Sequence, residues 1–398
     1  MKKLLLKLGL TEKDQKTIIN VFKYSFLGAI LIFGFSWIIQ YGIIQYKSQK
    51  RTKEAMDPTL LYEKKSKDLL PIDFEAHLFT AQYYLKNDMP SKAIEHLLRI
   101  IPIQKNNQEL QLNLATAYLS STQYDKALFC FQKMIEQNLN DTIKQKVLAR
   151  KGLALFYLGK IHESIKILDD CINNFPNSKE ALCYRGQIEV ALSENPQKAE
   201  EYFTKAISID STYTEAWYQL ARYWMLNAQY AKARLYLLKV LELEPLNVKA
   251  HARLGMVYYY LDEPEFAKKS YLTALALNDN DFNTHYNLGE LYYSKFMDEK
   301  NALIEFKKTL TYDPYHTEAN FKTGLICLNN NMNKEAVQYF KKALYNNSNN
   351  VRILLQLAVA YEKLSLKNDA LEIYKNIAQI DPLNKIALHK IKILSENN

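Results

Sequence analysis

The feature that most constrains the fold of this 398-residue chain is a pair of small residues, twelve or thirteen positions apart, that recurs nine times. The first members are Ala81, Ala115, Gly152, Gly186, Ala221, Gly255, Gly289, Gly324 and Ala358. The second members are Ala93, Ala127, Ser164, Ala199, Ala233, Ala267, Ala302, Ala336 and Ala370. Successive pairs are 34 to 37 residues apart, a period typical of stacked supersecondary units. The period therefore predicts a solenoid of short helix pairs, which usually presents surfaces to partners rather than sites for chemistry.

Charge is concentrated at one end of this otherwise globular composition. The chain has a net charge of +9, but residues 1–67 hold thirteen Lys or Arg and only five Asp or Glu, which leaves residues 68–398 at +1. A nucleic-acid-binding solenoid would need a basic stripe along its repeats. We therefore expect no nucleic-acid partner and assign the basic charge to the flanks of a membrane segment.

Residues 24–46 form an uncharged stretch of 23 residues, long enough to cross the hydrocarbon core of a bilayer as a helix. Lys23 and Lys47 close it on both sides, and it contains Trp37 and tyrosines suited to the membrane interface. A cleaved signal peptide is disfavoured because no small-x-small site follows the stretch. The sequence thus predicts a basic tail over 1–23, a transmembrane helix over 24–46 and a charged linker over 47–72.

The orientation of this span rests on an asymmetry of length. Lysines and arginines are balanced on the two sides, so the positive-inside rule gives a tie. A short tail with six lysines is hard to translocate, whereas a long domain crosses largely regardless of its charge. We therefore expect a single-pass protein of the bacterial inner (cytoplasmic) membrane, with its solenoid in the periplasm.

Each repeat unit has the pattern of two amphipathic helices. Around Ala221, an apolar face combines Trp217, Leu220, Ala221 and Trp224 at helical spacing. Small residues are required where two helices cross closely, because a large side chain would push their axes apart. Prolines follow the second helices at intervals of two units, where a missing N–H is tolerated: Pro176, Pro245, Pro314 and Pro382.

These units resemble the tetratricopeptide repeat family, whose pattern W-x2-L-G-x2-Y…A-x3-F…P is matched by Leu254-Gly255 with Tyr258, followed by Ala267 and Tyr271. The resemblance covers about four-fifths of the chain and implies an all-α, right-handed α-solenoid of about nine helix pairs over 73–384. A capping helix at 385–398 completes it. The repeats are expected to begin near residues 74, 108, 145, 179, 214, 248, 282, 317 and 351.

Some positions depart from the family pattern. Three extra residues between Asn138 and Ile143 predict an irregular junction between the second and third repeats. Ser164 stands where the other repeats have alanine, which is a mild change. Several tyrosines occupy places where the family requires an aromatic packing residue: Tyr84, Tyr118, Tyr258, Tyr292 and Tyr361.

The family resemblance implies that partners bind in a concave groove lined by outward residues of the first helices. In the middle repeats, it places in the groove Tyr218, Arg222, Met225, Arg253, Met256, Tyr259, Tyr286, Asn287, Glu290, Tyr293, Phe321 and Lys322. Aromatics, Met and Arg are suited to binding hot spots. The clamp with which some family members hold a terminal carboxylate is not formed, because its region here contains Leu78, Leu112, Asn113, Ala149 and Arg150.

Signatures of catalysis are missing from the sequence. It contains no G-x-G-x-x-G, G-x-x-x-x-G-K-[ST], G-x-S-x-G or H-E-x-x-H motif. His251 and His285 occupy the place of Trp217 in adjacent repeats, which favours packing over ligation. The four cysteines are interpreted as small hydrophobes of helices. We predict no enzyme, no catalytic residue, no metal and no cofactor.

The sequence leaves two functions open. The first is a membrane-tethered scaffold in the assembly of a large bacterial envelope complex, of which the periplasmic collar of a flagellar motor is one example. The alternative is an adaptor or regulator of an envelope-biogenesis enzyme of the lipopolysaccharide-assembly, pilus or secretion type. In both cases, the tether would raise the effective concentration of the groove at the membrane.

Overall fold

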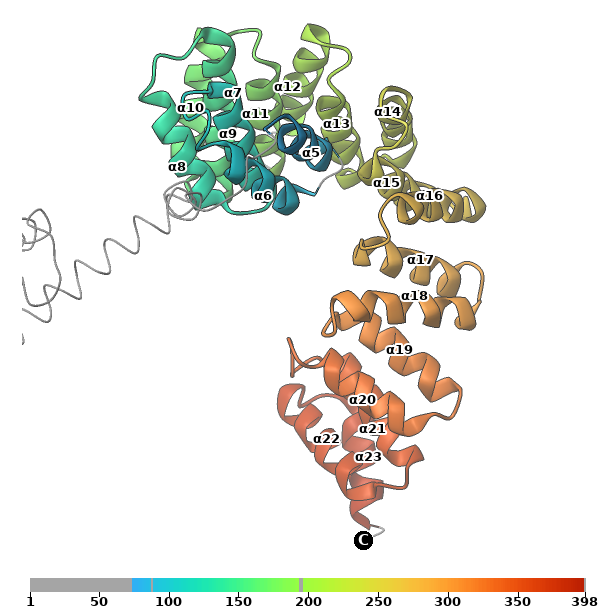
Figure 1. The fold of residues 1–398 in the computed structure, drawn as a ribbon. Helices are drawn as coiled ribbons and strands as arrows, with labels where there is room; N and C mark the ends of the chain where they lie inside the picture. The colour runs from blue at the N-terminus through green and yellow to red at the C-terminus, as the bar shows by residue number, and fades with distance from the viewer. Residues whose placement is uncertain (1–73, 87–88, 193–195, 397–398) are drawn as a thin grey trace, which may run out of the picture. The chain divides into compact units, whose positions relative to one another are not determined.

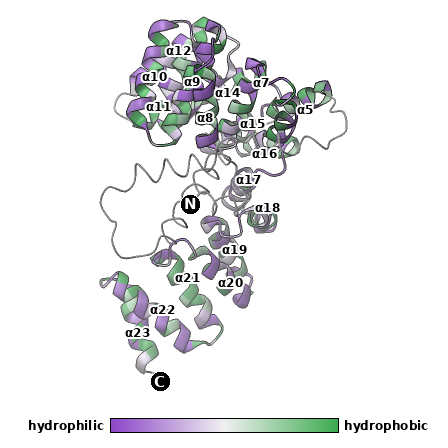
Figure 2. Ribbon diagram, turned by 60° about the vertical axis from the view of Figure 1, so that its left-hand side comes forward, coloured by the Kyte–Doolittle hydropathy of each residue, from purple (hydrophilic) through white to green (hydrophobic). Residues whose placement is uncertain are grey.

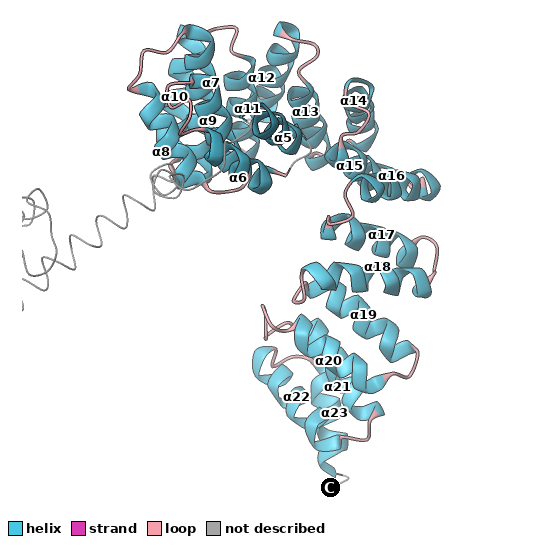
Figure 3. Ribbon diagram, in the orientation of Figure 1, coloured by secondary structure: helices cyan, strands magenta, loops and turns pink. Residues whose placement is uncertain are grey.

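The computed structural model describes residues 74–86, 89–192 and 196–396, and this part of the chain contains nineteen helices (Figure 1) and no strand (Figure 3). Within those ranges, no helix combines the length and the apolar character needed to cross a bilayer. The predicted tail, transmembrane helix and linker (1–23, 24–46 and 47–72) lie outside the described residues.

The helices fall into two compact units, Met1–Asn195 and Pro196–Asn398. The first unit contains α5 (Phe74–Lys86), α6 (Pro90–Ile100), α7 (Gln108–Ser120), α8 (Tyr124–Ile135), α9 (Asp141–Tyr157), α10 (Ile161–Asn174) and α11 (Lys179–Leu192). The second contains α12 (Pro196–Ile209), α13 (Thr214–Leu226), α14 (Tyr230–Leu243), α15 (Val248–Tyr260), α16 (Pro264–Leu277), α17 (Phe282–Ser294), α18 (Glu299–Tyr312), α19 (Thr317–Asn329), α20 (Asn333–Ala343), α21 (Val351–Lys363), α22 (Lys367–Ile380) and α23 (Lys385–Glu396). Nine helix pairs and a final helix result, as the sequence predicts.

In four repeats, the glycine of the first helix lies against a large side chain of the second: Gly152 against Leu168, Gly255 against Tyr271, Gly289 against Phe306 and Gly324 against Phe340. The nine second members, including Ser164, are fully buried. Four residues after each of them stands a large apolar side chain that is at most 2% exposed: Leu97, Phe131, Leu168, Phe203, Leu237, Tyr271, Phe306, Phe340 and Tyr374. Hydrophobic and hydrophilic residues therefore alternate along the helices, as Figure 2 shows. The hydroxyl of Ser164 donates to the Gly152 carbonyl at 2.6 Å, which explains how a polar atom is accommodated there.

The third repeat corrects the sequence-based prediction. Its first helix begins at Asp141, whereas the period predicts a start near Gln145. The Asn140 side chain caps this helix by accepting the Ile143 N–H at 2.8 Å. The inserted residues therefore lengthen α9 by one turn instead of forming a longer loop.

A hydrogen bond between a side chain and a loop recurs in five repeats. The side chain four residues before the first small residue contacts the carbonyl oxygen six residues earlier: Gln111 to Lys105, Trp217 to Ser211, His251 to Pro245, His285 to Asp279, and Asn320 to Pro314. The Trp217, His251, His285 and Asn320 nitrogens lie 2.8–3.0 Å from these oxygens. Because a carbonyl oxygen can only accept, the side chain is the donor. The two histidines thus tie inter-repeat loops to the helices that follow, which is a structural role.

Each described turn inside a repeat uses one residue with positive φ. These residues are Thr122, Gly159, Ala228, Asp262, Met297, Asn331 and Ser365, with φ from 53° to 76°. At the fifth repeat, the Gln229 N–H donates to the Trp224 carbonyl at 2.9 Å and the Ala228 N–H to that of Met225 at 3.0 Å. This pattern ends the first helix with a left-handed residue and gives the second helix a constant starting direction.

Candidate protein-binding groove

The predicted groove residues lie on the first helices of the second unit, α13, α15, α17 and α19. Of the twelve, Arg222 is exposed and ten are half-buried, so their side chains combine a packed base with an accessible end. Phe321 is the exception, since it is only 4% exposed. Its ring packs against Phe340 with centroids 5.9 Å apart, and the Arg352 guanidinium covers it at 4.2 Å. Phe321 is therefore a packing residue, which corrects its assignment to the accessible groove.

Contacts between neighbouring first helices fix the groove side chains of α15 and α17. The Tyr259 hydroxyl lies 3.0 Å from the Ser294 hydroxyl. The Lys295 ammonium lies 5.2 Å from the centre of the Tyr259 ring and forms an ion pair with Asp262 at 2.7 Å. Tyr259 is thus held from both sides, which reduces the entropy lost when it contacts a partner.

Farther along the groove, positive charges are compensated within the protein. Lys322 Nζ lies 3.1 Å from a Glu290 carboxylate oxygen and 4.5 Å from the centre of the Tyr293 ring. Arg352 reaches both carboxylate oxygens of Glu318, at 2.5 and 2.7 Å. Burial, together with the negative charges of Glu290 and Glu318, raises the pKa of Tyr286, so its hydroxyl stays neutral. This half of the groove is electrostatically balanced.

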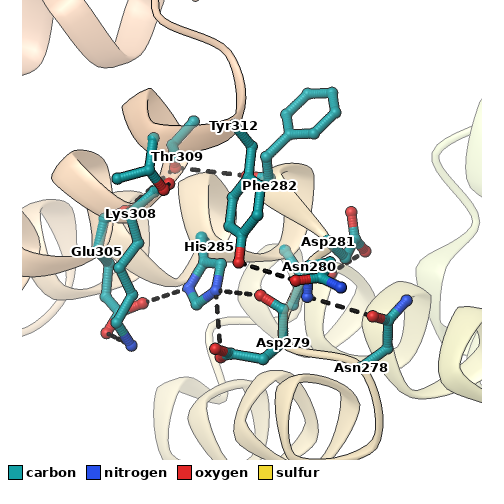
Figure 4. A network of polar contacts seen from close by, with 12 residues as sticks. Asn278, Asp279, Asn280, Asp281, Phe282, His285, Glu305, Lys308, Thr309 and Tyr312 are labelled. Carbon is teal, nitrogen blue, oxygen red and sulfur yellow. Dashed lines mark hydrogen bonds and ion pairs between the residues drawn. The ribbon is translucent and has the colours of Figure 1, made fainter.

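A polar network centred on the buried side chain of His285 connects α17, α18 and the loop that precedes α17 (Figure 4). His285 is fully buried; its Nδ1 lies 2.6 Å from Glu305 Oε2, and its Nε2 lies 2.9 Å from the Asp279 carbonyl oxygen. Burial lowers the pKa of His285, but the hydrogen bonds to Glu305 and Asp279 and the Glu305 charge outweigh it and raise the pKa above its ordinary value. Conversely, burial raises the pKa of Glu305, but His285 and Lys308 bring it below its ordinary value. We interpret the pair as an imidazolium and a carboxylate that support the seventh repeat.

The first unit shows a different arrangement at the equivalent helix faces. Arg150 of α9 donates to both carboxylate oxygens of Glu180, at 2.9 and 3.0 Å, and to the Thr116 hydroxyl at 2.6 Å. It is therefore occupied in linking α7, α9 and α11. Cys171, Cys183 and Cys327 are buried and Cys130 is half-buried, all as free thiols.

Comparison with known proteins agrees with this repeat geometry. The family described as "Tetratricopeptide repeat protein 21 N-terminal ARM repeat" matches residues 61–251, and the family described as "Tetratricopeptide repeat" matches residues 317–350. The chain is a tetratricopeptide repeat protein. Tetratricopeptide repeat proteins are scaffolds for protein–protein interaction.

Two relatives of this tetratricopeptide repeat protein are named after larger assemblies. It is 27% identical to the type IV pilus assembly protein PilF of Pseudomonas aeruginosa, over 36% of this chain and 58% of that protein. It is 22% identical to anaphase-promoting complex subunit 3 of Schizosaccharomyces pombe, over 90% of this chain and 52% of that protein. The chain therefore spans little more than half the length of these two relatives. The structure resembles a chain of the APC/C hetero-tetramer Cut9-Hcn1 with a TM-score of 0.56, at 18% identity over 81% of this chain and 63% of that chain, which supports the fold alone.

Proposed function

We propose that this protein is a non-enzymatic scaffold, tethered to a membrane, that holds segments of other proteins in the groove of its second unit during assembly of an envelope complex. The observation that carries the proposal is the row of half-buried Tyr, Met and Arg side chains on α13, α15 and α17. Such side chains offer large contact areas with little loss of conformational freedom. The groove is therefore suited to holding extended segments by their side chains.

The pilus type of assembly is favoured among the predicted envelope complexes. PilF is by its name a pilus assembly protein, and it matches 36% of this chain. We carry over from its name the general role of a factor in assembly.

The membrane tether is the second part of the proposal and rests on residues 24–46. A span there would restrict the groove to a thin layer at the membrane surface, where even a weak contact becomes frequent because the effective concentration is high. Fusing a periplasmic and a cytoplasmic reporter to Asn398 in separate strains tests this placement. Activity of the periplasmic reporter is expected, and activity of the cytoplasmic one would contradict a periplasmic groove.

Quantitative co-purification of the full chain from membranes, solubilised in mild detergent, tests the scaffold role. We expect structural subunits of one envelope assembly to be enriched with the wild type and lost with the groove variant Tyr218→Ala/Tyr259→Ala. Leu235→Ala/Leu272→Ala, which removes exposed side chains of α14 and α16, is the matched control. Recovery of a single soluble enzyme whose activity changes on binding would favour the adaptor alternative instead.

A further inference from the structure

The junction between the fifth and sixth repeats differs in charge from other junctions along the first helices. At two other junctions, the residue two before a small residue reaches the residue one after the small residue of the preceding repeat. Lys322 reaches Glu290 in this way at 3.1 Å, and Arg150 reaches Thr116 at 2.6 Å. In the fifth and sixth repeats, these two register positions are Arg222 and Arg253. Two like charges thus occupy the positions that hold the Lys322–Glu290 ion pair at the junction of the seventh and eighth repeats.

Neither arginine is compensated inside the protein. An N–H of Arg222 donates to the amide oxygen of Gln219 at 2.8 Å, and an N–H of Arg253 donates to the sulfur of Met256 at 3.4 Å. Across the residues that the structure describes, no carboxylate lies within ion-pair distance of either guanidinium. Because an arginine stays charged at any physiological pH and can donate five hydrogen bonds, both retain unused capacity for an anion.

The surroundings of the two arginines restrict what that anion can belong to. The half-buried side chains of Met225 and Met256 stand on the same helices, with Tyr218 and Tyr259 at neighbouring groove positions. A matching ligand must therefore present apolar groups directly beside its negative charges. A nucleic acid backbone would require a continuous basic stripe, whereas Lys322 and Arg352 farther along are neutralised by Glu290 and Glu318.

We infer that the junction of α13 and α15 binds an acidic polypeptide segment in which Asp or Glu side chains alternate with apolar ones. The inference rests on the proposed function and adds the chemistry of the partner. Recognition is divided along the groove: Arg222 and Arg253 select negative charge, and the balanced half on α17 and α19 contributes contacts that depend little on salt. An arginine–carboxylate contact in such a site provides both affinity and register.

Fluorescence anisotropy with the full-length protein in neutral detergent tests the inference. The probe is a labelled twelve-residue peptide of alternating glutamate and leucine, compared with the same peptide carrying glutamine for glutamate. We expect the glutamate peptide to bind about tenfold more tightly at low salt, and each of Arg222→Gln and Arg253→Gln to remove most of this preference. Lys239→Gln, which removes a cation of α14 that is already paired with Glu242 at 2.7 Å, is the matched control outside the groove and should leave the preference unchanged.

The outcomes separate the inference from the proposed function. Equal binding of both peptides would overturn the acidic preference while leaving groove binding intact. A preference that survives in both arginine variants would also overturn it, as would an oligonucleotide that displaces the glutamate peptide. Binding of neither peptide, even at low salt, would contradict the inference directly, whereas the proposed function would still be decided by co-purification.

Arg253→Glu adds a readout that does not depend on the probe. It places opposite charges at the two register positions, so we expect a higher melting temperature than for the wild type together with loss of the glutamate preference. A lower melting temperature would show that Arg253 already has a stabilising role in the fold and would contradict the idea that it is held for a ligand.

Discussion

The ring of Tyr271 lies so close to Gly255 that a methyl group at position 255 would come within 2.5 Å of ring carbon Cδ1 and 2.6 Å of Cε1. Tyr271 is 2% exposed, so its ring is enclosed by the core and cannot move without disturbing the side chains around it. Phe306 over Gly289 and Phe340 over Gly324 repeat the same relationship. In these three repeats, the glycine of the first helix is therefore the position against which an aromatic ring of the second helix packs.

The first prediction concerns the contact between Gly255 and the ring of Tyr271. We expect Gly255→Ala to lower the free energy of unfolding by about 1–3 kcal/mol, because overpacking forces a core side chain out of its position. Adding Tyr271→Leu should recover part of the loss, since the pair then copies Ala221 and Leu237 of the preceding repeat. Urea denaturation of the single and double variants measures both effects. A double variant less stable than Gly255→Ala would show that the ring is not the source of the clash.

The second prediction concerns the turns. Thr122 has a φ of 61°, which is unfavourable for a β-branched residue. Thr122→Gly is expected to raise the free energy of unfolding by about 0.5–1 kcal/mol, because glycine adopts this backbone region without steric cost. Thr204→Gly, on an exposed face inside α12, is the control and should destabilise by a similar amount. Denaturation midpoints that fall for both variants would contradict the strain assigned to Thr122.

The third prediction concerns the buried pair of His285 and Glu305. The raised pKa of His285 means that its contribution to stability is complete below the unfolded value of 6.5 and is lost as the pH rises through the folded value. The lowered pKa of Glu305 means that its contribution is complete above 4.5 and is lost as the pH falls through the folded value. The pair therefore stabilises the fold most between these two pH values.

Replacing His285 by Gln tests this pH window. The loss of unfolding free energy is expected to be about 3 kcal/mol near pH 5.5, because one partner of a buried ion pair is removed, and to become smaller toward pH 9. His251→Gln is the control, since it keeps a donor for the Pro245 carbonyl and His251 has no carboxylate partner within the described ranges. A His285→Gln deficit that grows with pH would refute the imidazolium.

The fourth prediction concerns charges in a repeat core. Arg185 and Glu189 are 9% and 6% exposed and form an ion pair at 2.6 Å, where the sixth repeat has Leu254 and Tyr258. Arg185→Leu alone should destabilise by about 3 kcal/mol, because it leaves Glu189 buried without its partner. Arg185→Leu/Glu189→Tyr should be as stable as the wild type or more stable, since an apolar pair replaces the ionic one. Chemical denaturation of both variants decides this, and an additive loss in the double variant would contradict it.

The repeat architecture could be predicted from the sequence because it depends on local spacing. A small residue every 34 to 37 positions is enough to place each helix pair and to identify Ala221 and Gly255 as crossing points. The start of α9 could not be placed correctly, because the pattern contains no information on whether inserted residues join a helix. The cap by Asn140, which decides this, is visible only in the structure.

The groove was predictable as a row of positions, but not as a set of accessible side chains. Phe321 occupies a groove position by register, yet Arg352 from the next repeat covers it. Likewise, Arg222, Arg253 and Lys322 are equivalent cations in the sequence. Only the distances show that Lys322 forms an ion pair and that, among the described residues, the two arginines do not. Contacts between repeats depend on side chains more than thirty residues apart, which a periodic pattern does not specify.

Site-specific photo-crosslinking in living cells tests the central claim, that partners bind along the first helices of the second unit, most directly. A photoreactive phenylalanine analogue at position 259 lies in the groove, and the same analogue at position 266 lies on α16, where the native Phe266 is 58% exposed. We predict discrete protein adducts from position 259 that disappear in the Arg222→Gln/Arg253→Gln background, and none from position 266. Adducts from position 266 with none from position 259 would contradict the account.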